Sequence, residues 1–519
     1  MAVGTSLSDD LRAAAKLHAD RPAVIDGSIT LTYAALDGAA EDLARALRDC
    51  GVRDGDCVVW HGRKSSAGVA VVHGILRSGA GYVPLDPDGP LTRADLITRA
   101  CAPRAIVADG AARAQWAESA PHLRWSALPA PPGADDGMWI SMRDGEPRPP
   151  VPDLAYVLHT SGSTGVPKGV VHTHASASAF VDWAVDELAL TPSDVVINSA
   201  PLHFDPTTLH LFAAVRSGAA VALMPAEAAP FPAAYIDFCH RTGGTVWYAV
   251  TSTLVWLVRH GTKLLPRLSG LRAAVTGGEV LHPEDVNTLA AALPGMRLLN
   301  VYGPTESNVC TFHEIKPPLQ PDDQVPIGRV LPGAQVLVAD EGLTAVPPGQ
   351  PGQLLVRGAM LMTGYLDAEQ TARSMVRTAD GREWYASGDQ VYEDPAGELR
   401  FIGRLDAQIK SRGYRVELGE VERAARRCTG IQECVAVATP DAVFSNLITA
   451  FVTARDETAA RLLPTRLTEF LPPYMLPRHV VLVDGELPRL SNGKVDRKSL
   501  TDMAASPELS MMNGFTIFS

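Results

Sequence analysis

The chain has 519 residues, a formal net charge of −12 and 46% hydrophobic residues, which is the profile of a folded protein long enough for two to four domains of about 100–200 residues. The acidic balance argues against a nucleic-acid partner, because binding to a phosphate backbone needs clustered Lys and Arg. No apolar run approaches the roughly 18 residues of a membrane span, and no two of the seven cysteines have C-x-x-C spacing, so we expect a cytoplasmic protein with reduced thiols and no membrane partner.

Apolar β-rich runs alternate with Ala-rich helical patterns along most of the chain, which is typical of α/β architecture. An amphipathic helix is predicted from about 31 to 47, followed by a strand at 54–59 and a helix at 68–76. The segment 129–152 is rich in Pro, Gly and Asp and predicts a surface loop. Short apolar runs at 245–248 and 271–275 predict buried parallel strands.

A second, smaller unit is predicted after the charged segment 403–415. Its pattern indicates one helix after Val416, strands near 434–438 and 447–453, a helix near 458–470 and a last strand near 479–483. The tail from about Asp502 shows no clear pattern. We therefore expect an N-terminal domain at 1–404 and a C-terminal domain at 405–519.

A loop rich in small and hydroxylic residues follows an apolar strand, in the sequence YVLHTSGSTGVPKG at 156–169. Such a loop offers backbone N–H and hydroxyl donors to an anion, and glycine permits the positive φ that wrapping requires. A flexible Ser/Gly connector is the alternative, but connectors rarely end in Pro-Lys-Gly. The spacing differs from the Walker pattern. The residues predicted to grip phosphate are Thr160, Ser161, Gly162, Ser163, Thr164, Gly165 and Lys168.

This loop resembles the signature of the adenylate-forming superfamily, which includes acyl-CoA synthetases, luciferases and adenylation domains of nonribosomal peptide synthetases. Further motifs follow in that family's order over almost the whole chain: LRSGAGYVPLD at 76–86, NVYGPTE at 300–306, 352–365, YASGD at 385–389, 403–420, LPPYMLP at 471–477 and NGKVDR at 492–497. The resemblance implies an α/β fold, with a large N-terminal body of layered sheets and helices and a small mobile α+β C-terminal domain.

The implied reaction has two steps. A carboxylate attacks the α-phosphorus of ATP to give an acyl-adenylate and pyrophosphate, and a thiol then takes the acyl group. By resemblance, Glu306 binds Mg²⁺ and Thr305 bonds the α-phosphate, which suits a step that needs charge neutralisation and alignment. The resemblance also implies that Tyr302 and Gly303 bind the nucleotide, with the ring of Tyr302 offering a face on which adenine can stack.

Four further residues take roles by the same resemblance. Asp389 accepts the ribose hydroxyls, and Arg404 faces the ribose and phosphates. Lys494, presented after an Asn-Gly turn, bridges the substrate carboxylate and the α-phosphate. Asp406 is the hinge about which the small domain rotates.

The pair Phe204-Asp205 matches the place where amino-acid-activating members set an Asp against the α-ammonium. Apart from Asp205 and Lys494 the pocket is apolar, with one phenol, so a compact apolar amino acid is expected. The pattern resembles stand-alone prolyl-adenylating enzymes, although Pro206 and Gly277 replace the expected Leu and Ala and leave open a substituted proline or another small aliphatic amino acid. The predicted lining is Asp205, Pro206, Leu209, Tyr248, Val275, Gly277, Val301, Val309 and Cys310.

The chain carries no Gly-Gly-x-Ser carrier segment and no condensation motif. We therefore expect a free-standing amino acid–carrier-protein ligase that uses ATP and Mg²⁺ and loads the phosphopantetheine arm of a separate carrier protein, with a possible small helper protein. The first alternative is an acyl- or aryl-CoA synthetase that uses free CoA, in which Asp205 would bind no ammonium. The second is a non-enzymatic nucleotide-binding or scaffold protein, which would be expected to lack Lys494 or Glu306. The fold alone does not separate these alternatives.

Overall fold

The computed structural model describes residues 6–162, 166–406, 408–441, 443–489, 495–506 and 515–518. Its contacts divide the chain into two compact units. The first comprises Met1–Pro87, Thr98–His159 and Gly169–Leu405, and the second comprises Asp88–Ile97, Thr160–Lys168 and Asp406–Ser519. No helix in the described parts is both long and apolar enough to cross a membrane.

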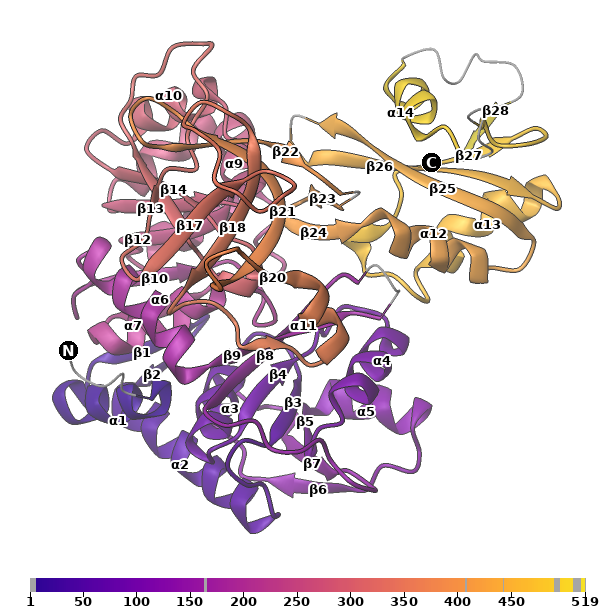
Figure 1. Cartoon of the computed structure of the whole chain (residues 1–519). Helices are drawn as coiled ribbons and strands as arrows, with labels where there is room; N and C mark the ends of the chain where they lie inside the picture. Colours follow the sequence, from indigo (N-terminus) through magenta and orange to yellow (C-terminus); the bar gives the residue numbers. More distant parts are fainter. Residues whose placement is uncertain are drawn as a thin grey trace. The chain divides into compact units, whose positions relative to one another are not determined.

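The largest sheet of the first unit carries a core of parallel strands, as expected from their apolar runs (Figure 1). Its described strands, in spatial order, are β16 (Arg329–Val330), β15 (Thr311–Ile315), β14 (Arg297–Tyr302), β13 (Ala273–Gly277), β12 (Val246–Val250), β10 (Val195–Asn198), β11 (Ala220–Leu223), β1 (Pro22–Asp26) and β2 (Ile29–Thr32). The parallel strands predicted at 245–248 and 271–275 are confirmed as the neighbours β12 and β13.

Side chains on these strands alternate between two cores, because successive strand residues point to opposite faces. Trp247 packs among the helices α8 (Pro232–Arg241), α9 (Thr251–Gly261) and α10 (Pro283–Ala292). Its neighbours Val246 and Tyr248 belong to the other core, which also takes residues from the first three helices and from the second sheet. The remaining helical segments here are α6 (His174–Glu187), η1 (Thr208–Ala213), α7 (Ala214–Ser217), η2 (Thr262–Leu268) and η3 (Thr305–Ser307).

A second sheet of the first unit is built largely from the N-terminal part of the chain. Its described strands, in order, are β19 (Gly364–Tyr365), β9 (Lys168–Thr173), β8 (Leu154–Thr160), β4 (Gly81–Pro84), β3 (Cys57–His61), β5 (Ala105–Asp109), β7 (Met138–Met142) and β6 (Trp125–Leu128). The helices of this region are α1 (Leu7–His18), α2 (Tyr33–Asp49), α3 (Ser66–Arg77) and α5 (Gly110–Ser119). The helix α4 (Leu91–Cys101) begins in residues of the second unit and ends in residues of the first. The helix predicted at 31–47 and the strand and helix predicted after it are confirmed, whereas β7 interrupts the loop predicted at 129–152.

A third sheet completes the first unit, with α11 (Ala368–Ser374) beside it. Its described strands are β17 (Ala334–Ala339), β18 (Gly352–Gly358), β21 (Glu383–Glu393), β20 (Met375–Arg377) and β22 (Leu399–Arg404). In the β21–β22 pair, Asp389 stands opposite Arg404. The sheet thereby brings these two predicted nucleotide ligands together.

The C-terminal part of the second unit is a small α+β body, as the sequence predicts. Its described elements are β23 (Gln408–Ser411), β24 (Tyr414–Glu417), α12 (Leu418–Arg427), β25 (Ile431–Asp441), β26 (Ser445–Ala454), α13 (Glu457–Leu467), η4 (Pro473–Met475), β27 (His479–Val483), α14 (Arg497–Ala505) and β28 (Phe515–Phe518). The four predicted elements between 434 and 483 are confirmed. The tail also holds β28, paired antiparallel to β27, which the sequence pattern did not indicate.

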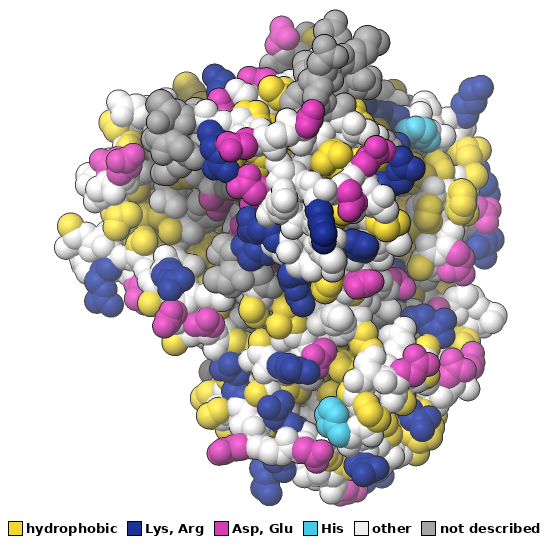
Figure 2. All heavy atoms as spheres, turned by 90° about the vertical axis from the view of Figure 1, so that its right-hand side faces the viewer, with side chains coloured by type: hydrophobic (Ala, Val, Ile, Leu, Met, Phe, Trp, Pro, Cys, Tyr) yellow, Lys and Arg dark blue, Asp and Glu magenta, His cyan; other side chains and the backbone are white. Residues whose placement is uncertain are grey.

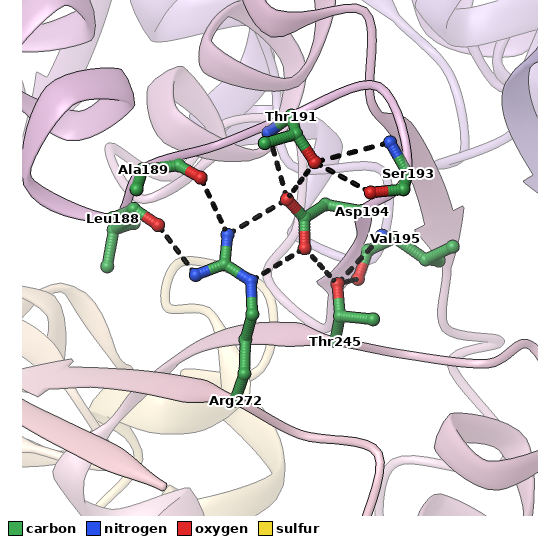
Figure 3. A network of polar contacts seen from close by, with 8 residues as sticks. All are labelled: Leu188, Ala189, Thr191, Ser193, Asp194, Val195, Thr245 and Arg272. Carbon is green, nitrogen blue, oxygen red and sulfur yellow. Dashed lines mark hydrogen bonds and ion pairs between the residues drawn. The ribbon is translucent and has the colours of Figure 1, made fainter.

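A polar network fixes the amino ends of β10, β12 and β13 (Figure 3). Both oxygens of Asp194 accept from Arg272, at 2.8 and 2.9 Å, and Thr245 donates to the same carboxylate at 2.7 Å. Burial raises the pKa of Asp194, but the bonds from Arg272 and Thr245 outweigh it and lower that pKa to about 2. The network lies at the edge of the sheet opposite the carboxyl ends of the same strands.

The surface view in Figure 2 shows Lys and Arg side chains interspersed with Asp and Glu. A face that binds a phosphate backbone gathers basic side chains instead. The cysteines are free thiols, all but Cys50 of them buried, in agreement with reduced side chains that pack as small apolar groups.

Candidate functional site

Several predicted pocket residues lie at or near the carboxyl ends of three adjacent parallel strands. The register pairs Tyr248 of β12 with Val275 of β13, and Gly277 of β13 with Val301 of β14. Ligands of open α/β sheets bind at this edge. The strand order thus gathers residues that lie more than 50 positions apart in the sequence.

The apolar part of the predicted lining forms one buried cluster. Leu209, Tyr248, Val275, Val301 and Val309 all belong to the same core. Cys310 is equally buried but packs in a different cluster, with Ile327, Leu354 and Tyr302 among its members. The structure therefore brings these five candidates together and places Cys310 in the cluster against which Tyr302 packs.

Asp205 lies beside this cluster, at the start of the turn that leads into the π-helix η1. Its carboxylate accepts a hydrogen bond of 2.8 Å from the hydroxyl of Thr305, and it remains partly exposed. Burial raises the pKa of Tyr248, and the negative charge of Asp205 raises it further. Pro206 is buried directly after Asp205, and its carbonyl accepts from the N–H of His210.

At two glycines of the site, the backbone of a neighbouring segment comes so close that a side chain would not fit. A Cβ on Gly277 would stand 2.1 Å from the carbonyl oxygen of Val301, and a Cβ on Gly303 would stand 2.5 Å from that of Asn308. Neither position has room for alanine without a backbone shift. Gly277 therefore reflects the packing of β13 against β14, and its difference from the expected Ala does not by itself indicate a larger substrate.

Three of the predicted nucleotide ligands form one polar cluster. The carboxylate of Asp389 accepts from Arg404 at 2.6 Å through one oxygen and from the hydroxyl of Tyr302 through the other. Ser387 fixes the backbone of Asp389 through its hydroxyl. Burial, followed by the charge of Asp389, raises the pKa of Tyr302, so its phenol remains a donor. Asp389 still has lone pairs for two ribose hydroxyls.

Glu306 lies in the 3₁₀ turn η3, one residue after Thr305, and is fully buried. The hydroxyl of Tyr365 donates to its carboxylate at 2.5 Å. No group of three or more His, Cys, Asp or Glu that could hold a metal ion occurs among the described residues. A single oriented carboxylate fits Mg²⁺ that is held mainly by phosphate oxygens and water, which is how this ion usually binds with nucleotides.

Part of the phosphate loop falls in the second unit. Ser161 donates to the carbonyl of Arg415, and Lys168 lies 3.8 Å from Glu417. Gly162 is constrained, since a Cβ there would stand 1.9 Å from the carbonyl oxygen of Val166. Thr160 ends β8 with its side chain buried. Ser163, Thr164, Gly165 and Lys494 lie outside the described residues.

Sequence reasoning missed several polar residues that support Asp205 and Thr305. The hydroxyl of Tyr156 donates to Asn308 and accepts from Thr208, and His172 bonds the carbonyl of Thr305 at 2.9 Å. His210 bonds the carbonyl of Tyr248 at 3.0 Å from a fully buried position, which agrees with a packing role. In the sequence, the one local signal for these supporting residues was the short polar run at 305–308. Their partners Tyr156 and His172 lie on strands that are far away in the sequence.

Comparison with known proteins gives the family. Residues 11–366 match the family model of the AMP-binding enzymes, and residues 420–494 match that of the AMP-binding enzyme C-terminal domain. The chain belongs to the AMP-binding enzymes. The predictions of an adenylate-forming fold and of an ATP-dependent, AMP-forming ligase are confirmed.

Among curated AMP-binding enzymes, the chain is 34% identical over 487 residues to an L-proline–[L-prolyl-carrier protein] ligase of Pseudomonas fluorescens, covering 92% of this chain and 95% of that protein. It is 35% identical over 513 residues to a ligase of the same name from Streptomyces coelicolor, covering 93% and 94%. The solved structure of holo-PA1221, a nonribosomal peptide synthetase protein with adenylation and PCP domains, matches with a TM-score of 0.78 and 27% identity over 96% of this chain and 84% of that one.

Proposed function

We propose that this enzyme activates a small apolar amino acid, L-proline or a substituted proline, as an aminoacyl-adenylate and transfers it to the phosphopantetheine thiol of a separate carrier protein. The observation that carries the proposal is the Asp205 carboxylate, partly exposed beside a buried apolar cluster. A carboxylate there binds the α-ammonium through a charge-assisted hydrogen bond and repels acids without one. The two curated relatives named above, both L-proline–[L-prolyl-carrier protein] ligases, support the choice of proline.

In the first step, Asp205 orients the amino acid so that its carboxylate faces the α-phosphorus. Thr305 donates to the α-phosphate, and Lys494 is proposed to neutralise the charge that develops between carboxylate and phosphate. Glu306 would hold Mg²⁺, which supplies charge neutralisation on the phosphates when bound. The contribution of these side chains is alignment and electrostatic stabilisation, because the reaction needs no covalent protein nucleophile.

Asp389, Tyr302 and Arg404 are proposed to hold the nucleoside. Asp389 accepts from the ribose hydroxyls, while its existing bond to Arg404 keeps the carboxylate oriented. The ring of Tyr302, with its hydroxyl fixed on Asp389, offers a face for adenine. The loop of Thr160, Ser161, Gly162, Ser163, Thr164, Gly165 and Lys168 is proposed to grip the β- and γ-phosphates.

The division into domains at 1–404 and 405–519, with Asp406 as the hinge, stays a prediction. It is supported by the separation of the two compact units between Leu405 and Asp406. Action in the cytoplasm, where ATP is supplied and thiols stay reduced, and a small helper protein are likewise proposals.

The alternative of an acyl- or aryl-CoA synthetase is tested with two substrates of nearly the same shape. Cyclopentanecarboxylate has the ring and the carboxylate of proline but no ammonium. We expect ATP–pyrophosphate exchange with proline at least about tenfold above that with cyclopentanecarboxylate, the size of a charged hydrogen bond. Asp205→Ala should remove the preference. Equal rates with the two acids in the unmodified enzyme would refute the role of Asp205 and favour the alternative.

A further inference from the structure

Five residues around the Asp205 carboxylate are joined into a closed ring of hydrogen bonds. The hydroxyl of Thr305 donates to Asp205 at 2.8 Å, and the backbone N–H of Asn308 donates to the carbonyl of Thr305 at 3.4 Å. The side-chain oxygen of Asn308 accepts from the hydroxyl of Tyr156 at 3.2 Å, and the same hydroxyl accepts from Thr208 at 3.3 Å. The N–H of Thr208 donates to the carbonyl of Asp205 at 3.0 Å and closes the ring.

Asp205 and Thr208 belong to one segment, the Asp205 loop (205–208), and Thr305 and Asn308 belong to a second, the Thr305 loop (305–308). Tyr156 is the member of this ring that lies outside both loops. It stands on β8, is fully buried, and packs its ring against those of Tyr82 and His172, with centroids 5.5 and 5.0 Å away. Burial raises its pKa to about 12 against the opposing effect of its two hydrogen bonds, so the phenol keeps its proton and remains a donor. A rigid strand therefore holds both loops through one hydroxyl.

Asn308 has a backbone conformation that L residues rarely adopt, with φ of 53° and ψ of −81°. Its side chain is 6% exposed, and the side-chain nitrogen has no hydrogen-bond partner in the described part of the chain. An unfavourable backbone and an unsatisfied buried amide persist when the surrounding structure requires them, and they occur most often at functional sites. Asn308 therefore turns the chain after η3 at a cost in stability, and its side-chain oxygen reaches Tyr156.

We propose that Tyr156 and Asn308 are positioning residues that hold the Asp205 carboxylate at the distance and angle required by the substrate ammonium, and so set the selectivity for amino acids over plain acids. The inference rests on the proposed function of Asp205. Neither residue is among the proposed ligands of the amino acid or of ATP. They act by fixing the loop of Asp205 and the loop of Thr305 to the same strand.

The ring predicts a larger effect on the amino acid than on ATP. In the described part of the chain, the nucleoside cluster of Tyr302, Asp389 and Arg404 is joined to neither Tyr156 nor Asn308 by a hydrogen bond. Loss of the Tyr156 hydroxyl should therefore weaken amino-acid binding more than ATP binding, since ATP is also held by the nucleoside cluster. A general loss of packing would weaken both to the same extent.

The test uses Tyr156→Phe and Asn308→Gly, which break the same hydrogen bond from its two ends. Glycine at 308 retains access to the positive φ, and Tyr82→Phe is the matched control because it removes the hydroxyl of the neighbouring buried phenol. KM for proline and for ATP is measured by ATP–pyrophosphate exchange in each variant and in the double variant. Thermal unfolding of each variant separates folding defects from binding defects.

We expect each variant to raise KM for proline about fivefold, the net size of one hydrogen bond, and to raise KM for ATP by less than about twofold. The double variant should match Tyr156→Phe alone, because that variant has already lost the hydrogen bond that Asn308→Gly removes. The ratio of kcat/KM for proline over cyclopentanecarboxylate should fall by the same factor, and Tyr82→Phe should change none of these values. Unchanged KM for proline in both variants, parallel rises in both KM values, or multiplicative effects in the double variant would overturn the inference while leaving the proposed function intact. Absence of amino-acid-dependent exchange in the unmodified enzyme would instead refute the proposed function.

Discussion

The hydroxyl of Thr305 lies 2.8 Å from the carboxylate of Asp205, which joins two segments 100 residues apart in the chain. A hydroxyl carries one proton, so Thr305 donates either to Asp205 or to a phosphate oxygen. An ammonium group bound at Asp205 would satisfy that carboxylate and release the Thr305 hydroxyl. In this account the amino-acid site and the phosphate site are linked through a single proton.

Substitution of Thr305 tests this link. Thr305→Val keeps the shape of the side chain but removes the proton, and we expect it to lower kcat for ATP–pyrophosphate exchange about tenfold or more, because a donor to a charged oxygen is lost. Thr305→Ser keeps the donor and should stay within about threefold of the unmodified enzyme. Equal rates in the Val and Ser variants would show that the hydroxyl plays no part in the reaction.

Gly277 gives a second prediction, on stability rather than selectivity. Because a Cβ there would stand 2.1 Å from the carbonyl of Val301, Gly277→Ala should lower the free energy of unfolding by about 2 kcal/mol or more. The ranking of amino acids in the exchange assay should stay the same. An alanine variant that is as stable as the parent and that prefers a smaller amino acid would show instead that residue 277 lines the pocket.

His73 should make the enzyme sensitive to acid. It is buried on α3, neither ring nitrogen has a hydrogen-bond partner among the described residues, and burial, followed by the charge of Arg77, lowers its pKa to about 3. In the unfolded chain the pKa of this histidine is about 6.5, so as the pH falls the unfolded chain binds the proton before the folded chain does. The stability that the neutral His73 contributes is therefore present above pH 6.5 and is lost as the pH falls toward 3.

The variant that tests this is His73→Leu, compared with the parent by denaturant unfolding at pH 7.5 and pH 5.0. Below pH 6.5 the parent loses about 1.4 kcal/mol of unfolding free energy per pH unit through His73, and the variant does not. Between pH 7.5 and pH 5.0, the unfolding free energy of the variant should therefore rise by about 2 kcal/mol relative to that of the parent. His61, His172 and His210 have lowered pKa values for the same reason of burial and cancel in the comparison. A difference that is equal at the two pH values would contradict the assignment.

The network in Figure 3 should stabilise the sheet without taking part in the reaction. Asp194→Ala leaves the donors of Arg272 and Thr245 without their acceptor, and we expect a loss of about 2 kcal/mol or more in unfolding free energy. Glu369→Ala removes one partner of an exposed ion pair and serves as the control, with an effect below about 0.5 kcal/mol. KM values of the folded Asp194 variant should match the parent. A change in KM for ATP would mean that the network extends to the site.

The sequence predicted those features that depend on local pattern. The parallel strands β12 and β13 are short apolar runs, and the motifs around Asp205, Thr305 and Asp389 have characteristic residues in a fixed order. The strand β28 was missed because its pairing with β27 is a long-range contact that leaves no local pattern. The strand β7 was missed because Gly, Pro and Asp surround its five residues.

The supporting residues of the site were beyond sequence reasoning for a related reason. Tyr156 reads as an ordinary buried aromatic of a strand, and only the folded chain shows its hydroxyl between Thr208 and Asn308. In the same way Cys310 follows Val309 in the chain, yet the turn at Asn308 directs the two side chains into different clusters. Roles that depend on the direction of a side chain are fixed by backbone geometry that the residue types alone do not specify.

The enzyme is proposed to activate an amino acid of proline's size and charge. The decisive measurement is amino-acid-dependent ATP–pyrophosphate exchange with a panel that includes proline, pipecolate, valine and alanine. We predict the strongest exchange with proline or a substituted proline. A strong signal from an unrelated amino acid together with none from proline would contradict proline as the substrate, and exchange driven equally well by acids without an ammonium group would contradict amino-acid activation altogether.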